Sequence, residues 1–268
     1  MKSPTTAIAE HHRRAIDRLV EAYGDDDRFV AVIIGGSVAK GYARPDSDVD
    51  FMIVATDAEY ARRDASDDLF INRTDLCDYA GGFVDGKVID MAYLRDVAGF
   101  GNEPSRAAFT GAFTAFCHEH EVETLLPAIP VYPEEDRDRR IRAFYSMAFI
   151  QHWLMGEAAR HGNAYTIQRA ASQLALFAGR LILAHNRVLY PYHKWLKQAL
   201  EDAPGKPEGF MSSLDALNTA PSLETAGRLF GSIREFRDWG VEDLEAYLWF
   251  MREVEWDWRD GKPSLEDL

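Results

Sequence analysis

The feature that most constrains this chain is a short apolar segment that ends in a glycine pair and precedes two closely spaced aspartates. The segment Phe29–Ile34 is short and rich in β-branched residues, which predicts a buried strand. Gly35, Gly36 and Ser37 follow it directly. Glycines at this point predict a tight turn and allow the backbone to approach a phosphate group closely. The Ser37 amide and hydroxyl are then available to donate to phosphate oxygens.

Two carboxylates accompany the next predicted strand, residues 49–55. Asp48 and Asp50 are two residues apart and alternate with Val49 and Phe51. Alternate strand residues face the same side, so both carboxylates are expected in one pocket while their neighbours pack in the core. Such a pair is costly in an apolar strand without a cation, and Mg²⁺ is commonly held by carboxylates together with phosphate oxygens. The pattern predicts a divalent-metal site completed by a nucleoside triphosphate, with Ser47 as a further donor.

A third carboxylate, Asp90, is expected on a later strand. Residues 83–93 contain the pair Asp85-Gly86 between extended-type residues, which is a strong local signal for a β-hairpin. A turn at this pair would place Asp90, with its neighbours Ile89 and Met91, on the returning strand. The alternative for the whole set is that the carboxylates only cap loops.

Helical periodicity dominates the remainder of the chain. Residues 5–23 predict an opening helix that stops at Gly24. Residues 137–161 and 165–186 carry long helical patterns, and a final amphipathic helix is expected from 241 to about 258. Strands early and helices late predict the α+β fold class.

Together, the glycine-serine turn, the Asp-hydrophobic-Asp strand and the later aspartate resemble the nucleotidyltransferase superfamily typified by DNA polymerase β. The resemblance covers roughly residues 29–94 and implies a mixed β-sheet with flanking helices. It also implies that Asp48 and Asp50 bind two ions of Mg²⁺ or Mn²⁺, and that Asp90 binds the catalytic one. The implied co-substrate is an NTP, with ATP the expected one, and the implied product of its cleavage is pyrophosphate.

The division into domains follows the change in pattern. Residues 1–132 are expected to form the nucleotidyltransferase domain, and residues 133–268 a helical bundle that completes the nucleotide and acceptor cleft. This organisation resembles that of enzymes that adenylylate aminoglycoside and lincosamide antibiotics. In the helical half, Lys194 is expected to reach the triphosphate, and Tyr190 or Tyr192 to contact the nucleotide. The equally weighted alternative is packing at a helix end.

Charge limits the classes of binding partner, and cysteine spacing indicates the state of the thiols. The formal net charge of −14 disfavours long nucleic acid and suits a small cationic molecule. Cys77 and Cys117 lack the spacing of a disulfide framework or a zinc site, so both are expected to remain thiols. The absence of a signal-like start and of a long apolar run predicts a cytoplasmic protein without a membrane partner.

The function expected is transfer of AMP, or another NMP, to a hydroxyl of a small molecule such as an aminoglycoside- or lincosamide-like antibiotic. Transfer to protein side chains, and an NTP-binding regulator or antitoxin-like partner without turnover, stay open as alternatives. The general base is expected to be Asp90 or one of three later glutamates: Glu119, Glu121 and Glu157.

Arg180 and His185 match the loose Arg-x4-His spacing of HEPN ribonucleases. The residues between them are Leu, Ile, Leu and Ala. This apolar run favours a buried helix core over a ribonuclease site.

Overall fold

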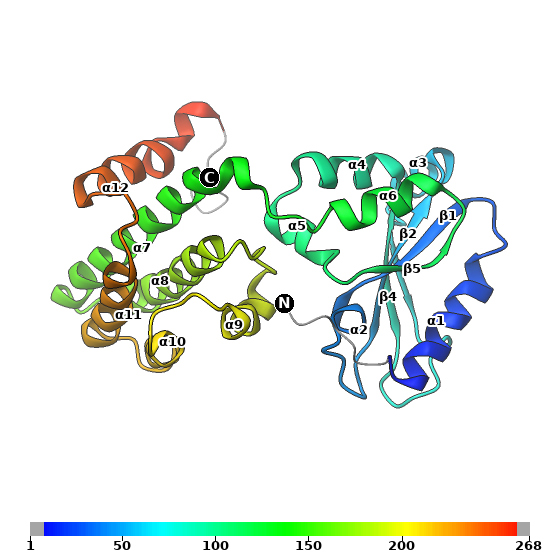
Figure 1. The fold of residues 1–268 in the computed structure, drawn as a ribbon, viewed down its shortest axis with the longest axis horizontal. Coiled ribbons are helices and arrows are strands. Elements are labelled where there is room, and N and C mark those ends of the chain that lie inside the picture. The colour runs from blue at the N-terminus through cyan, green and yellow to red at the C-terminus, as the bar shows by residue number, and fades with distance from the viewer. Residues whose placement is uncertain (1–7, 262–268) are drawn as a thin grey trace. The chain divides into compact units, whose positions relative to one another are not determined.

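The two strands predicted on either side of the glycine-serine turn are neighbours in a five-stranded sheet (Figure 1). In the computed structural model, which describes residues 8–261, the strand order is β3-β4-β2-β1-β5. β2 and β4 run parallel, whereas the other neighbouring pairs run antiparallel, so the predicted mixed sheet and α+β class are confirmed. The strands are β1 (Phe29–Ile34), β2 (Val49–Ala55), β3 (Phe70–Arg73), β4 (Val84–Ile89) and β5 (Phe113–Cys117).

The chain divides into two compact units, one ending at Val131 and the next beginning at Tyr132. The boundary expected from the sequence lay one residue later. All five strands belong to the N-terminal unit. Its helices are α1 (Glu10–Tyr23), α2 (Gly36–Lys40), α3 (Asp57–Asp64), α4 (Met91–Phe100), α5 (Glu103–Ala108) and α6 (His120–Ala128).

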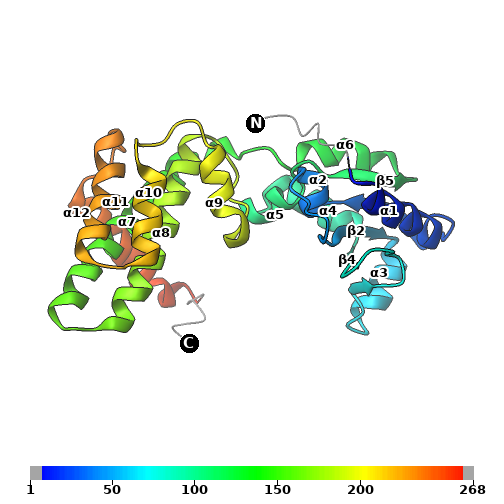
Figure 2. The ribbon, with the colours of Figure 1, turned by 90° about the horizontal axis from the view of Figure 1, so that it is seen from below.

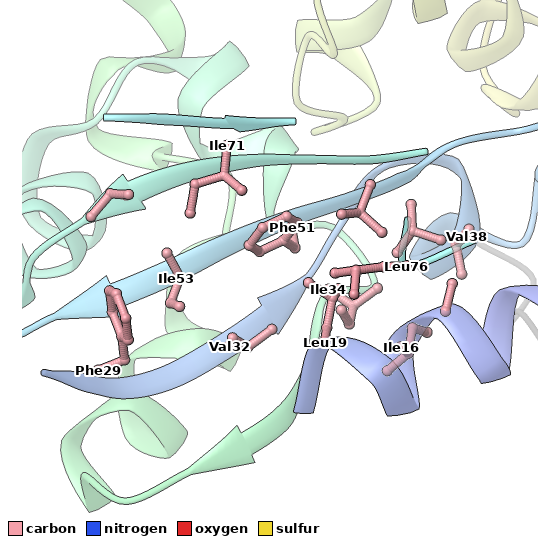
Figure 3. Packing of buried hydrophobic residues seen from close by; sticks show 14 of the residues in the cluster. Ile16, Leu19, Phe29, Val32, Ile34, Val38, Phe51, Ile53, Ile71 and Leu76 are labelled. Carbon is pink, nitrogen blue, oxygen red and sulfur yellow. The ribbon is translucent and has the colours of Figure 1, made fainter. Parts of the chain in front are cut away.

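One face of the sheet is covered by α1. Ile16 and Leu19 of this helix join Phe51 and Ile53 of β2 in a single buried cluster (Figure 3). Burying a side chain of this size contributes about 1.5–3 kcal/mol, so the apolar stripe of α1 fixes the helix on the sheet. Phe51 and Ile53 therefore face the core, as the alternation along β2 predicts.

The opposite face of the sheet carries a second core, formed with α4 and α6. Val54 and Ile89 pack there with Leu94 of α4. Asp50 and Asp85 are on the same face of β2 and β4 but are only half-buried, because they lie nearer the beginning of each strand. The sheet thus presents two carboxylates beside a packed core.

The hairpin predicted at Asp85-Gly86 is wrong, because β4 runs through both residues without turning. Gly86 is in register with Phe51 of β2, and a Cβ atom at Gly86 would lie 2.1 Å from Cζ of the Phe51 ring. This glycine makes room for a neighbouring ring. The connection between the antiparallel strands β3 and β4 occurs earlier, in residues 74–83, where Gly81 has a φ of +73°.

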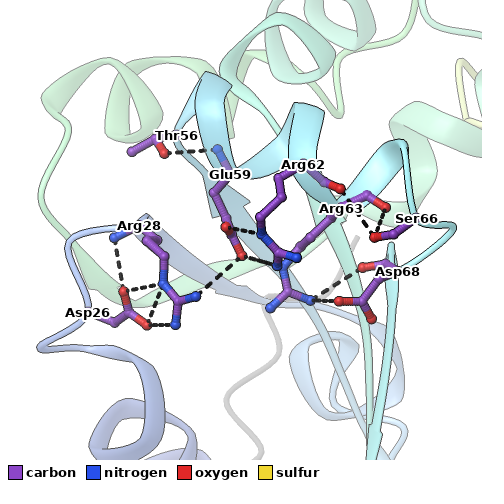
Figure 4. Close-up of polar contacts among 8 residues, drawn as sticks. All are labelled: Asp26, Arg28, Thr56, Glu59, Arg62, Arg63, Ser66 and Asp68. Carbon is purple, nitrogen blue, oxygen red and sulfur yellow. Dashed lines mark hydrogen bonds and ion pairs between the residues drawn. The ribbon is translucent and has the colours of Figure 1, made fainter.

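A network of charges anchors α3 after the end of β2 (Figure 4). The buried Glu59 carboxylate accepts hydrogen bonds from Arg62 at 2.8 Å and from Arg63 at 2.7 Å, and Arg28 lies 3.8 Å away. The Arg62 hydrogen bonds are the largest cause that lowers the pKa of Glu59 to about 2. Burial opposes them, and the Arg63 hydrogen bond and the charges of both arginines lower the pKa further. Thr56 caps the helix by accepting from the Glu59 amide at 3.4 Å.

The second unit is built from helices and contains no strand within its described part. α7 and α8 pack along each other, and Figure 2 shows them from a second direction. The long helical patterns at 137–161 and 165–186 are confirmed. The final helix is shorter than expected. α12 ends at Phe250, and the backbone continues first as a short π-helical segment and then as a short 3-10 helix. The elements are η1 (Glu134–Asp136), α7 (Arg137–Arg160), α8 (Ala164–His185), α9 (His193–Asp202), α10 (Phe210–Thr219), α11 (Leu223–Phe236), α12 (Asp243–Phe250), η2 (Met251–Glu255) and η3 (Asp257–Asp260).

Within residues 8–261, none of the helices combines the length and apolar character required to cross a bilayer. Cys77 and Cys117 are free thiols.

Candidate active site

Three aspartates converge at the beginning of the parallel strands β2 and β4. Asp48, Asp50 and Asp85 each offer a carboxylate oxygen, and these oxygens lie within 4.8 Å of one another. Asp50 and Asp85 are directly in register across the parallel pair. Side chains in register on neighbouring strands share one face of a sheet, which brings these two carboxylates together. Asp48 precedes β2 and adds the third.

The electrostatics of this group favour a cation. Partial burial raises the pKa of Asp85, and the negative charge of Asp48 raises it further, while Lys87 has a smaller opposite effect. Converging carboxylates repel one another, and a bound divalent ion would offset that repulsion. The donor set, which consists of oxygen atoms from three carboxylates, matches the preference of Mg²⁺ and Mn²⁺ for hard ligands.

The glycine pair shapes the space next to Asp50. The Gly35 amide donates to the Asp50 carbonyl at 2.9 Å, which ties the turn after β1 to β2. Gly36 has a φ of +59°, and a Cβ atom at this position would lie 1.7 Å from Oδ2 of Asp50. The Asp50 carboxylate therefore occupies space that any other residue at position 36 would fill.

Ser37 lies in the first turn of the short helix α2 and is buried. Its hydroxyl oxygen has no hydrogen-bond partner in the described part of the chain. Buried hydroxyls are normally paired, so an unsatisfied one beside the glycine turn fits a site in which a ligand supplies the partner.

The side chain of Ser47 makes a hydrogen bond within the loop that precedes β2. Its hydroxyl accepts a hydrogen bond from the Arg44 amide at 2.9 Å. Its carbonyl oxygen accepts two more, from His12 at 3.0 Å and from the Tyr79 hydroxyl at 2.8 Å. The structure therefore places Ser47 next to the carboxylates but uses it to shape the loop that carries Asp48.

Asp90, which the sequence predicts as the third metal ligand, is not a member of the group of converging carboxylates, and its role as a ligand stays a prediction. It follows the last residue of β4 and caps α4 by accepting from the Tyr93 amide at 2.7 Å. Asp90 is five residue steps along the chain from Asp85, or roughly 16 Å at the usual rise of a strand. Burial raises the pKa of Tyr60 in α3, and the charges of Asp64 and then Asp90 raise it further. Asp85 is the third member of the carboxylate group.

The Asp85-Gly86 pair predicts a turn, but Asp85 lies within β4. It lies between the apolar residue Val84 and a glycine, on a segment whose alternation matches that of β2. Residues 84–89 form a strand because they pair with β2 and because Gly86 makes room for the Phe51 ring. Both contacts are with residues distant in sequence, so the local pattern does not indicate them.

The residues predicted around Lys194 lie in the helical unit. Lys194 is in the first turn of α9, with its Nζ 5.6 Å from the centre of the Trp195 ring. Tyr190 is buried, and its hydroxyl lies 3.1 Å from Nδ1 of His193, whereas Tyr192 is exposed. The contact of Lys194 with a triphosphate stays a prediction.

The Arg-x4-His stretch is packed as a helix core. The Arg180 guanidinium lies 4.3 Å from the ring centres of both Phe144 and Tyr190. His185 makes edge contacts with Phe236 and with a tryptophan of the following loop. Burial lowers the pKa of His185, and nearby arginines lower it further. These contacts are those of a packed helix.

The three glutamates considered as general bases have other contacts. Glu121 is paired with Arg95 at 2.6 Å, and Glu157 is paired with Arg160. Glu119 caps α6. None of the three belongs to the group of converging carboxylates in the described residues.

Comparison with known proteins agrees with this geometry. Residues 13–87 match the family model described as a nucleotidyltransferase domain. The matched segment includes the glycine turn and all three converging aspartates, and it ends before Asp90. The N-terminal unit therefore contains a nucleotidyltransferase domain of the DNA polymerase β superfamily.

Among solved structures, the chain is similar to a nucleotidyltransferase-like protein from Exiguobacterium sibiricum 255-15. The two sequences are 11% identical, the similarity covers 90% of this chain and 80% of that chain, and the TM-score is 0.45. No curated protein matches the chain.

Proposed function

We propose that this protein transfers a nucleoside monophosphate from an NTP to a hydroxyl group of a small-molecule acceptor, using a divalent metal. The observation that carries the proposal is the convergence of Asp48, Asp50 and Asp85 within 4.8 Å, beside a glycine turn and inside the segment that matches a nucleotidyltransferase domain. An enzyme of the transferase type is what such a domain supports. ATP is the NTP that we propose.

The three aspartates would hold Mg²⁺ or Mn²⁺, with Asp48 and Asp50 as shared ligands and Asp85 as the third. When bound, the metal would neutralise charge on the phosphate oxygens and on the attacking oxygen. Gly36 leaves the space in which the Asp50 carboxylate sits, and the glycine turn allows a phosphate group to approach the backbone. Ser37 provides a buried hydroxyl beside it.

The reaction would form one bond and break one. The acceptor oxygen bonds to the α-phosphorus of the NTP, the bond from that phosphorus to the α–β bridging oxygen breaks, and pyrophosphate leaves with the bonding electrons. The hydroxyl proton must pass to a base within hydrogen-bond reach. We assign this role to Asp85, because it replaces Asp90 in the carboxylate group.

The acceptor class rests on charge. A net charge of −14 opposes the approach of long nucleic acid and favours cationic small molecules. Aminoglycosides and lincosamides therefore head the list of acceptors to test. We also propose that Lys194 of the helical unit contacts the triphosphate.

The experiment measures pyrophosphate release from each common NTP with Mg²⁺ or Mn²⁺, against a panel of aminoglycosides, lincosamides and cell extract. We expect acceptor-dependent release that Asp85→Asn reduces by a factor of about 100 or more, as expected when a group essential to charge stabilisation is lost. Asp90→Ala is the matched control. It should retain the activity and lose only about 1 kcal/mol of stability, as for other lost helix caps.

Other outcomes select other functions. Label that appears on protein in the extract would favour protein nucleotidylation. Metal-dependent NTP binding without any pyrophosphate release would favour a regulator that binds NTP. Equal activity in Asp85→Asn and the wild type would contradict the assigned site.

A further inference from the structure

The loop that carries Asp48 is held by contacts from two distant segments. Residues 41–48 contain no strand or helix, and Asp48 is followed at once by β2. The carbonyl of the preceding residue, Ser47, accepts hydrogen bonds from both His12 and Tyr79. His12 belongs to α1, and Tyr79 belongs to the connection between β3 and β4.

The geometry fixes the chemistry of this contact. The Ser47 carbonyl can only accept, so Nε2 of His12 carries the proton that it donates across 3.0 Å. The other ring nitrogen, Nδ1, is buried without a hydrogen-bond partner in the described part of the chain. His12 is only 1% exposed. Among the described residues, the bond to Ser47 is therefore the only hydrogen bond of the buried His12 ring.

Aromatic packing holds the two donors relative to each other. The ring of His12 lies edge-on to that of Tyr79 at 5.3 Å between centres, and the His11 ring is 4.6 Å from Tyr79. Separately, Arg14 of α1 binds Asp78 at 2.8 Å. The contact between α1 and the β3–β4 connection therefore has an exposed ionic part and a buried part that reaches Ser47.

We infer that His12 and Tyr79 are positioning residues, which hold the Ser47 carbonyl and thereby aim the Asp48 carboxylate at the metal. Neither side chain belongs to the metal-ligand group. Both act through the peptide that precedes Asp48, because a carbonyl fixed by two donors restricts the rotation of the backbone that carries the carboxylate. The inference rests on the proposed function of the carboxylate group.

The test uses variants that remove one donor at a time. Tyr79→Phe removes only the hydroxyl, and His12→Ala removes the ring. His12→Gln keeps an amide nitrogen able to reach the Ser47 carbonyl. Arg14→Ala is the matched control, because it removes one of the two arginines with which α1 binds Asp78, the other being Arg18, and does not touch Ser47.

The readout is binding of Mn²⁺ to the full-length protein in the presence of an α,β-methylene ATP analogue, measured by calorimetry. We expect the dissociation constant for Mn²⁺ to rise about three- to tenfold in Tyr79→Phe and in His12→Ala, as for the loss of one ordinary hydrogen bond. His12→Gln should recover most of the affinity, and Arg14→Ala should match the wild type. Thermal unfolding of each variant shows that the folded protein is being compared.

The outcomes separate this inference from the proposed function. Wild-type affinity in Tyr79→Phe and His12→Ala would overturn the positioning role and leave the metal site standing. An equal loss in Arg14→Ala would also overturn it, because docking of α1 alone would then explain the effect. A wild-type protein that binds no Mn²⁺ with the analogue would overturn the proposed function and this inference with it.

Discussion

The candidate site depends on a few positions where one atom decides what is allowed. Gly36 and Gly35 are adjacent, yet only Gly36 has a positive φ and a neighbour that would overlap its Cβ. At Gly35 the nearest atom to an added Cβ is the Ala108 carbonyl oxygen at 3.6 Å, which is ordinary contact. The pair looks symmetrical in the sequence and is not symmetrical in the structure.

This difference gives a prediction for the two glycines. Gly36→Ala should abolish pyrophosphate release, because the methyl group would displace the Asp50 carboxylate and the backbone would be strained by about 1 kcal/mol or more. Gly35→Ala should retain most of the activity. Steady-state assays and thermal unfolding of both variants provide the check, and equal loss in both would contradict the assigned role of Gly36.

Sequence reasoning was most successful where the signal is local. Asp48 and Asp50 could be found because alternation along β2 depends only on adjacent residues. Asp85 was missed because an Asp-Gly pair locally favours a turn, while the parallel pairing with β2 decides otherwise. The partners of the Ser47 carbonyl are 35 and 32 residues away in sequence, and no local pattern indicates them.

At the scale of elements, β1 and β2 have local sequence signals, whereas β3 and β5 depend on long-range pairing. The first two are apolar runs with clear ends. β3 has four residues and β5 has five, and all five residues of β5 are half-buried, so neither presents a distinct apolar pattern. Their existence follows from pairing with β4 and β1, which the sequence alone does not display.

The anchoring of α3 by Glu59 predicts a dependence of stability on pH. The folded-state pKa of about 2 lies below the ordinary 4.5, so this carboxylate stabilises the fold fully above pH 4.5. That contribution is lost as the pH falls from 4.5 toward 2. Glu59→Gln should lower the free energy of unfolding at pH 7 by about 1–2 kcal/mol, a modest value because Arg28 and Arg62 are largely exposed.

Urea titrations at pH 7 and at pH 3 test this prediction. The difference in stability between the wild type and Glu59→Gln should shrink at pH 3, because Glu59 is then protonated in the unfolded wild type while it is still ionised in the folded one. A difference that stays constant across this range would show that packing, and not the ionised carboxylate, provides the stability.

At the scale of the whole molecule, the two units differ in which residues of the proposed site they contain. The N-terminal unit contains the matched domain and the three converging carboxylates. The helical unit contains the basic and aromatic stretch around Lys194, for which the sequence predicts contact with the triphosphate. Its two long helices, α7 and α8, were predictable because their periodicity is long and local, whereas contact of Lys194 with a triphosphate depends on a ligand and stays a prediction.

Kinetics of Lys194→Ala test whether the helical unit takes part in nucleotide binding. If Lys194 binds the triphosphate, its loss should raise the KM for the NTP about tenfold with a smaller change in kcat, as for one charge-assisted hydrogen bond. Lys197→Ala is the matched control, because this exposed lysine of the same helix is paired with Asp215 at 2.8 Å. An unchanged KM for the NTP in Lys194→Ala would contradict the predicted contact between Lys194 and the triphosphate.

The position of His12 bears on how the protein is prepared. The matched segment begins at residue 13, so a fragment cloned to those limits would retain Asp48, Asp50 and Asp85 and would omit the histidine that holds Ser47. Such a fragment would also begin inside α1. Weak metal affinity measured on such a fragment would result from the missing residues and would not be a property of the full-length protein, so expression plasmids should include the first turn of this helix.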